Sequence, residues 1–317
     1  MVLPRRRLLH TVGTASVAAL AGCSELNSLG SESSEPEYRL RIEPVETSLT
    51  EHALYEPDDG ALFGAPARTA LDAILPEGRY TTYGYKPLPT DAYVGYEGAY
   101  YQTKHIVTGR ERTERSLVRV DTVADDEVPD SALLVDNLER PSARTLKILH
   151  TYTQSEGKSS AADLLRDDAY VLRRPAELES RLGTGDLDNR VVTMTESGAW
   201  AYRVTVTTER IVEPAYTAFA AEVAGSRDVF REVVLGSRVD AELTADSLSA
   251  DVRSIIEEAV SAEMYAETPP LSDAYEATLG ALGLHDVEQA KNGQLLWYNE
   301  QLYRYSLYIV QPSTRGA

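Results

Sequence analysis

The sequence predicts an α+β fold in which helices cover antiparallel β-hairpins. Three segments of similar sequence each resemble the turn of a hairpin, and a helical pattern precedes each of them. These segments are Gly98–Gln102, Gly198–Arg203 and Glu300–Arg304, and their tyrosines Tyr101, Tyr202 and Tyr303 recur at intervals of 101 residues. We therefore expect three imperfect helix-plus-hairpin units, at 38–125, 126–212 and 213–317, whose hairpins join into one sheet. Chance similarity among hairpins is the alternative interpretation.

The first residues have the layout of an export signal. Arg5, Arg6 and Arg7 precede a mostly apolar run over 8–21, and small residues stand directly before Cys23. A membrane span needs about 20 apolar residues, and this run is shorter. The pattern therefore favours a cleaved signal over a retained span.

These residues resemble those of a known class of exported protein. The arginine run resembles a twin-arginine export signal, and Leu-Ala-Gly-Cys at 20–23 resembles a lipobox. With the acidic composition, they are similar to the lipoproteins of halophilic archaea. The resemblance implies removal of 1–22, a lipid on Cys23, and attachment to the outer face of the cytoplasmic membrane. Pro4 departs from the family's Ser or Thr, which leaves an ordinary secretory signal as the alternative.

The charge of the chain bears on its setting and partners. There are 31 basic and 50 acidic residues, a net charge of −19, and only five of the basic residues are lysines. Acids are scattered through every segment, as expected for adaptation to high salt, where self-repulsion is screened. An ordinary acidic protein that binds cations or a basic partner is the alternative. The acidic composition disfavours nucleic acid as a partner, because phosphate recognition needs a basic stripe.

The single cysteine, Cys23, leaves none for a disulfide in the body, so the fold depends on its core. The segment 23–37 is rich in serine and acids and is expected to be a flexible tether after the lipid anchor. The acidic α+β body is expected over 38–317. It begins where apolar and charged residues alternate over 38–43, as they do in a half-buried strand.

Further elements follow from spacing and from proline and glycine signals. Helices are expected over 66–75, from Pro141 onward, over 214–223, over 252–260 and over 272–282. Strands are expected from Trp200 to Thr207 and from Leu302 to Val310. The last of these is apolar on both faces, which predicts a central or covered strand.

The search for chemistry finds no catalytic motif and no metal-ligand spacing, and no cofactor is expected. Tyrosine is abundant, with 19 in the chain. Tyr83, Tyr85 and Tyr96 are the candidate binding surface, because exposed tyrosines suit stacking on sugars or anchoring a protein. Cross-strand pairing inside hairpins is the alternative for these side chains.

The expected function is that of a membrane-anchored surface lipoprotein that acts as a non-catalytic interaction module. Its partners would be the membrane, through the lipid on Cys23, and a protein or a polysaccharide. The alternative is an exported hydrolase or a solute-binding lipoprotein of a transporter. A deep pocket with converging polar groups would favour that alternative.

Overall fold

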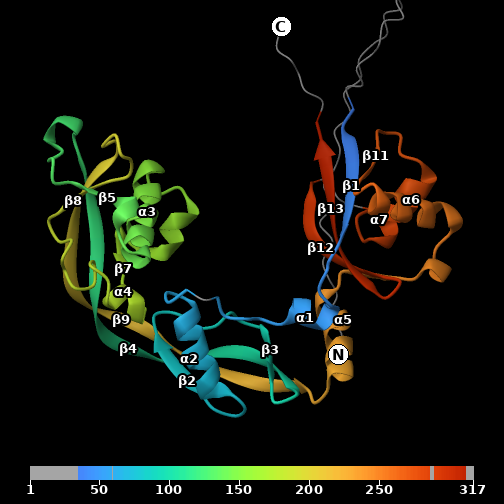
Figure 1. The fold of residues 1–317 in the computed structure, drawn as a ribbon, viewed down its shortest axis with the longest axis horizontal. Coiled ribbons are helices and arrows are strands. Elements are labelled where there is room, and N and C mark those ends of the chain that lie inside the picture. The colour runs from blue at the N-terminus through green and yellow to red at the C-terminus, as the bar shows by residue number, and fades with distance from the viewer. Residues whose placement is uncertain (1–34, 59, 286–288, 312–317) are drawn as a thin grey trace, which may run out of the picture.

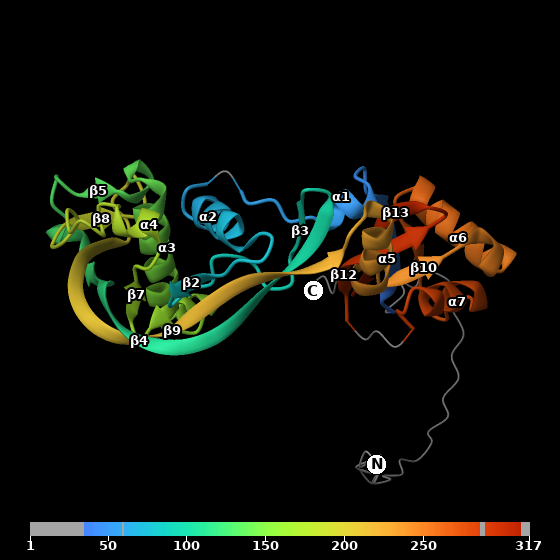
Figure 2. The same ribbon diagram turned by 90° about the horizontal axis from the view of Figure 1, so that it is seen from below.

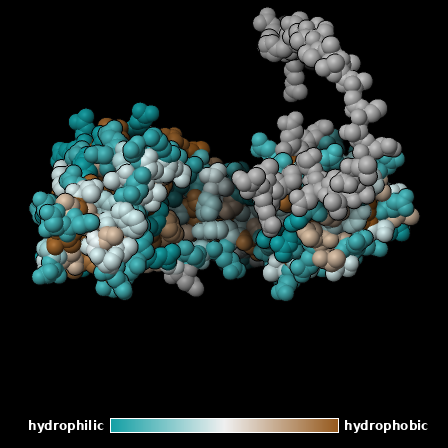
Figure 3. Space-filling view, turned by 90° about the horizontal axis from the view of Figure 1, so that it is seen from above, coloured by the Kyte–Doolittle hydropathy of each residue, from teal (hydrophilic) through white to brown (hydrophobic). Residues whose placement is uncertain are grey.

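The structure is a computed structural model, and it describes residues 35–58, 60–285 and 289–311. It confirms the α+β class: two separate sheets are combined with helices. Figure 1 shows a U-shaped molecule with a lobe at each end, and Figure 3, which looks from above, shows a narrower middle between the two lobes. Cys23 and the three arginines at 5–7 lie outside the described residues. Within the described ranges, no helix combines the length and apolar content that crossing a bilayer requires.

The elements of the first half of the chain are β1 (Glu37–Pro44), α1 (Leu49–Ala53), α2 (Gly64–Ile74), β2 (Tyr80–Tyr83), β3 (Tyr93–Tyr96), β4 (Ala99–Val123), η1 (Asp125–Glu127), β5 (Leu133–Leu134), η2 (Val135–Asn137) and α3 (Arg140–Gln154). Those that follow are η3 (Ser160–Leu164), β6 (Leu165–Arg166), β7 (Ala169–Val171), α4 (Pro175–Leu178), β8 (Val191–Thr193), β9 (Ala201–Ala224), α5 (Arg227–Arg238), β10 (Ala241–Leu243), η4 (Ala245–Ser247), α6 (Ala250–Ser261), β11 (Tyr265–Glu267), α7 (Asp273–Ala281), β12 (Lys291–Tyr298) and β13 (Gln301–Val310).

A long antiparallel ribbon of β4 and β9 connects the two lobes. Its pairs run from Tyr100 with Ala224 to Val123 with Ala201, with irregularities at 100–101 and 107–109. Figures 1 and 2 both show the ribbon curving along the base of the U. The helix predicted over 214–223 is wrong, because these residues continue β9. Pairing with β4, and with β2 over 215–218, overrides the helical preference of the alanines there.

The α3 lobe contains β5 to β8, α3, α4 and the adjoining ends of the ribbon. Its sheet has the strand order β5-β8-β9-β4-β7-β6, with β5 parallel to β8. The predicted helix after Pro141 is α3, which buries Leu146 and Leu149 in a core with Tyr202 and Val204. In Figures 1 and 2, α3 lies on the side of this sheet that faces the opening of the U.

The α6–α7 lobe contains β1 and β10 to β13, in the order β10-β12-β13-β1-β11. Strand β13 is central, as predicted, and pairs with both β12 and β1. Helices α6 and α7 match the expectations for 252–260 and 272–282. They pack on the sheet and bury its residues Leu40, Ile42 and Tyr305. Ser272 begins α7 by accepting a hydrogen bond from the backbone N–H of Tyr275.

The three predicted hairpins are present as β3–β4, β8–β9 and β12–β13. The expectation of a single antiparallel sheet is wrong, because the first two hairpins belong to one sheet and the third to another. Parallel pairs also occur in each sheet. The expected units 38–125, 126–212 and 213–317 do not follow these sheets, since β9 runs through the boundary at 212–213 and pairs with β4.

The junction between the ribbon and the α6–α7 lobe is built around α5. Phe230 is fully buried there and stacks on Tyr100, with ring centroids 4.2 Å apart and an interplanar angle of 6°. Tyr93 of β3 meets the same ring edge-on, at 5.3 Å. These aromatic contacts join both strands of the first hairpin to α5.

Candidate functional site

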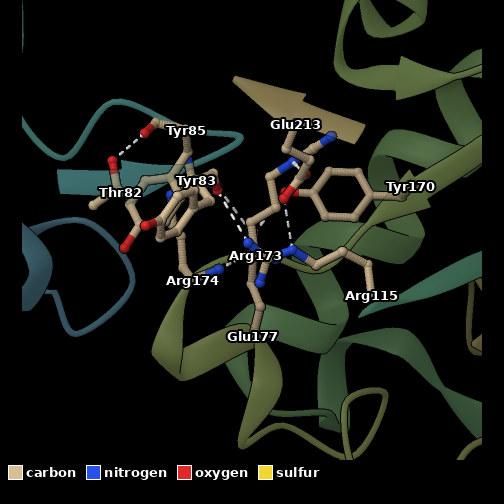
Figure 4. Close-up of polar contacts among 9 residues, drawn as sticks. All are labelled: Thr82, Tyr83, Tyr85, Arg115, Tyr170, Arg173, Arg174, Glu177 and Glu213. Carbon is tan, nitrogen blue, oxygen red and sulfur yellow. Dashed lines mark hydrogen bonds and ion pairs between the residues drawn. The ribbon is translucent and has the colours of Figure 1, made fainter. Parts of the chain in front are cut away.

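Two carboxylates are buried where β9 and α4 meet the loop after β2 (Figure 4). The first is Glu213 of β9, whose side chain is 2% exposed. Its Oε2 accepts a hydrogen bond from Nε of Arg115 at 2.7 Å, and its Oε1 accepts one from Nε of Arg173 at 2.6 Å. Each oxygen therefore faces its own guanidinium, the arrangement that a buried carboxylate requires.

The second carboxylate is Glu177 of α4, whose side chain is 1% exposed. Its Oε2 accepts hydrogen bonds from the backbone N–H groups of Arg173 and Arg174, at 2.8 and 2.9 Å. Its Oε1 accepts from the hydroxyl of Tyr170 at 2.7 Å and from Nη1 of Arg174 at 3.2 Å. Burial raises the pKa of Glu177, but these hydrogen bonds outweigh that effect and hold the pKa below its ordinary value.

The loop after β2 closes this network from one side. Arg115 donates through Nη2 to the backbone carbonyl of Tyr83 at 3.1 Å. Gly84 follows at φ +76°, and a Cβ built there would lie 2.2 Å from Oε1 of Glu213 and 2.6 Å from Nε of Arg173. Only glycine combines this backbone conformation with so close an approach.

The network positions arginines rather than presenting a reactive carboxylate. All four oxygens of Glu177 and Glu213 already accept hydrogen bonds within the chain, and Glu177 is held ionised. Arg174, fixed in this way, stacks its guanidinium on the rings of Phe63 and Tyr85, at 4.8 and 5.4 Å from their centroids. These contacts form a rigid layer in which cations and aromatic rings alternate.

Arg144 of α3 continues this layer toward solvent. Its guanidinium lies 5.1 Å from the centroid of Phe63, and its Nη1 donates to the hydroxyl of Tyr170 at 2.8 Å. Arg140 and Lys147 follow the helical spacing on the same side of α3. We call these three residues, Arg140, Arg144 and Lys147, the basic face of α3.

A groove of about 480 Å³ runs beside the basic face, between α3 and η3. Its other wall, on η3, includes Ala161 and the exposed Leu164, and Ile148 adds apolar surface on the α3 side. None of the described residues that line it is an aspartate or glutamate, and α3 itself contains none, in a chain with 50 acids. Lys147 pairs with Asp136 at 2.7 Å across an exposed edge. The groove is therefore a basic and apolar surface on an acidic protein.

The predicted tyrosine surface divides in two. Tyr83 and Tyr85 lie at the arginine network: a hydrogen bond to Glu111 raises the pKa of Tyr83, and burial raises that of Tyr85. Tyr96 lies at the turn end of β3 and is paired across the hairpin with Ala99, which fits the alternative of a hairpin residue. The structure thus brings two of the three residues together.

Sequence reasoning missed the arginines and both buried glutamates. Arg115, Glu213 and the local pair of Arg173 and Glu177 come from three separate places in the chain, and no spacing relates these places. The available signal was the acid-free stretch over 140–155, whose basic residues recur at helical spacing. Within the part of the chain that the structure describes, no three His, Cys, Asp or Glu side chains gather as a metal site would require.

His105 of β4 gives a testable pH dependence. Both of its ring nitrogens are buried without a hydrogen-bond partner among the described residues, and burial, with the charge of Lys86, lowers its pKa below the ordinary 6.5. As the pH decreases through about 6.5, the unfolded chain therefore takes up the proton before the folded chain does. The free energy of unfolding decreases as the pH is lowered. We expect His105→Leu to flatten this fall in urea unfolding at pH 7.5 and 5.5. Some slope is retained, because His52 and His150 also have lowered pKa values. An unchanged pH profile would contradict this assignment.

In comparisons with known protein families, with curated proteins and with solved structures, nothing matches this chain.

Proposed function

We propose that this chain is an exported lipoprotein, held at the outer face of the cytoplasmic membrane through Cys23, that binds an acidic partner protein without catalysing a reaction. The anchor follows from the arginine run at 5–7 and the lipobox at 20–23. Cys23→Ser is expected to shift the protein from the membrane fraction to the soluble fraction. Retention of the serine variant in the membrane would overturn the anchor.

The basic face of α3 is the observation that supports the binding role. A body with a net charge near −20 repels an acidic partner over most of its surface. The groove beside α3 is an exception, because its charged lining residues are all cations. Its apolar wall adds contact area that salt does not screen, so a polypeptide with both acidic and apolar side chains fits it better than a purely polar polymer.

The rigid layer behind the groove supports the same role. Arg144 is held by Tyr170 and Phe63, and Tyr170 in turn donates to the buried Glu177. A guanidinium that is already fixed loses less side-chain entropy when a carboxylate binds it. The layer therefore gives the basic face a defined geometry in the free protein.

The test neutralises two cations of the basic face. Arg140→Gln with Lys147→Gln is expected to weaken binding of a labelled 15-residue Glu/Leu amphipathic peptide about tenfold, because two exposed charge contacts are each worth up to about 1 kcal/mol. Fluorescence anisotropy measures the affinity at the lowest salt concentration at which thermal unfolding shows the wild type to be folded. The same peptide with Gln in place of Glu is the uncharged reference.

The matched control is Arg203→Gln with Arg210→Gln, which changes the net charge equally at exposed positions of β9. Peptide affinity should stay within twofold of the wild type there. Equal weakening by both pairs would mean that net charge, and not the basic face, governs binding, and would remove the support for this site.

A further inference from the structure

A second hollow, separate from the basic face, lies at the junction of the ribbon and the α6–α7 lobe. Its volume is about 340 Å³, within the range of small-molecule sites. Helices α1 and α5 and strand β12 form three of its sides, and the segment before β3 forms the fourth. Most of the wall is apolar, with Leu49, Leu54, Val234 and Leu295 among its residues.

Arg238 supplies the cationic group of this hollow. Its guanidinium lies over the ring of Tyr93, 5.2 Å from the centroid, and its Nη2 donates to the backbone carbonyl of Asp91. The carboxylate of Asp91 is engaged by Lys104. Among the described residues Arg238 forms no salt bridge within 4.0 Å, although its charge contributes to lowering the pKa of Asp91. Its N–H groups other than the one bonded to the Asp91 carbonyl can therefore donate to an anion.

The other polar groups in the wall are compatible with an anion and with one hydrogen bond to it. His52 lines the hollow, and burial together with the charge of Arg304 lowers its pKa, which leaves a neutral imidazole at neutral pH. Thr90 adds a hydroxyl. In the part of the chain that the structure describes, no aspartate or glutamate lines the wall, which disfavours a cationic ligand.

We propose that this hollow binds a small organic anion with an apolar body, its carboxylate on Arg238 and its hydrocarbon part against Leu49, Val234 and Leu295. A guanidinium suits a carboxylate because it offers two parallel N–H groups. Since the wall includes α1, α5 and β12 together with the segment before β3, the ligand also links the ribbon to the α6–α7 lobe. The hollow shares no lining residue with the groove beside the basic face, so binding there is independent of the proposed partner.

The test uses octanoate as the probe, and octan-1-ol as its uncharged counterpart, on the full chain. We expect calorimetry to show one saturable octanoate site with a dissociation constant of about 1 mM or tighter. Arg238→Met should weaken octanoate about tenfold and leave octanol unchanged, while Arg238→Lys should keep part of the octanoate affinity. Ala53→Leu, which fills the hollow, should weaken both probes.

Arg231→Met is the matched control, because it removes another cation from α5 that stacks on Trp297 and does not line this hollow. Its octanoate affinity should equal that of the wild type. Thermal unfolding of each variant confirms that it is folded. Absence of saturable binding to the wild type, or equal loss of octanoate binding in the Arg231 and Arg238 variants, would overturn the proposal.

Discussion

Glu213→Ala is expected to lower the free energy of unfolding by about 3–5 kcal/mol. The substitution leaves Arg115 and Arg173 without the carboxylate that both contact, and the side chain of Arg115 is only 10% exposed. An unpaired cation in such a place cannot recover its hydration, so the loss exceeds the worth of the ion pair itself. Urea unfolding monitored by circular dichroism measures the change.

Glu209→Ala is the control on the same strand. Its side chain is 42% exposed and forms ion pairs with Arg119 at 3.5 Å and Arg166 at 4.0 Å. The substitution should therefore lower the free energy of unfolding by at most about 1 kcal/mol. Added salt should reduce the effect at Glu209 more than the effect at Glu213. A similar decrease in the free energy of unfolding for the two variants would show that Glu213 does not act as a buried structural charge.

Phe230→Ala is also expected to lower the free energy of unfolding by about 3–5 kcal/mol, but for a different reason. The ring is fully buried and contacts Tyr93 and Tyr100, so its removal leaves a cavity and ends two aromatic contacts. Because these contacts join the first hairpin to α5, the loss should centre on the junction. Hydrogen exchange should show faster opening of β3 and α5 than of α3.

Val229→Ala, one residue earlier on α5, provides the comparison. Val229 is 52% exposed, and its truncation should change the free energy of unfolding by no more than about 0.5 kcal/mol. A small effect at Phe230, or uniform loss of protection through both lobes, would mean that the aromatic contacts do not hold the junction.

The elements that sequence predicts well are those whose burial pattern is local. Helix α6 buries Val252, Ile255 and Ile256 at helical spacing, and β1 buries Leu40 and Ile42 at strand spacing. The same reasoning fails for the segment 214–223, because the spacing of its alanines fits both a helix and a strand. Its conformation is decided by β4, which lies about a hundred residues away in the chain.

The candidate site was less accessible to sequence reasoning than the fold. The abundance of tyrosine points to Tyr83 and Tyr85, but it does not predict Arg115 and Arg174, which contact them in the structure. Charged residues are common in this chain, and nothing in their spacing separates Glu213 from its exposed neighbour Glu209. Burial separates them, and burial is a property of the assembled ribbon.

The connectivity of the ribbon also has a kinetic consequence. In its ladder, Val123 with Ala201 is the pair closest in the chain, and Tyr100 with Ala224 is the most distant. Closing the shorter loop costs less entropy, so the α3 lobe, which lies within that loop, is expected to form first and to set the register. Pairing of β4 with β9 can then extend one residue pair at a time toward the junction. In the α6–α7 lobe, β1 precedes the ribbon in the chain and the other strands follow it. The lobe is therefore expected to assemble last, once pairing of β4 with β9 has brought those two segments together.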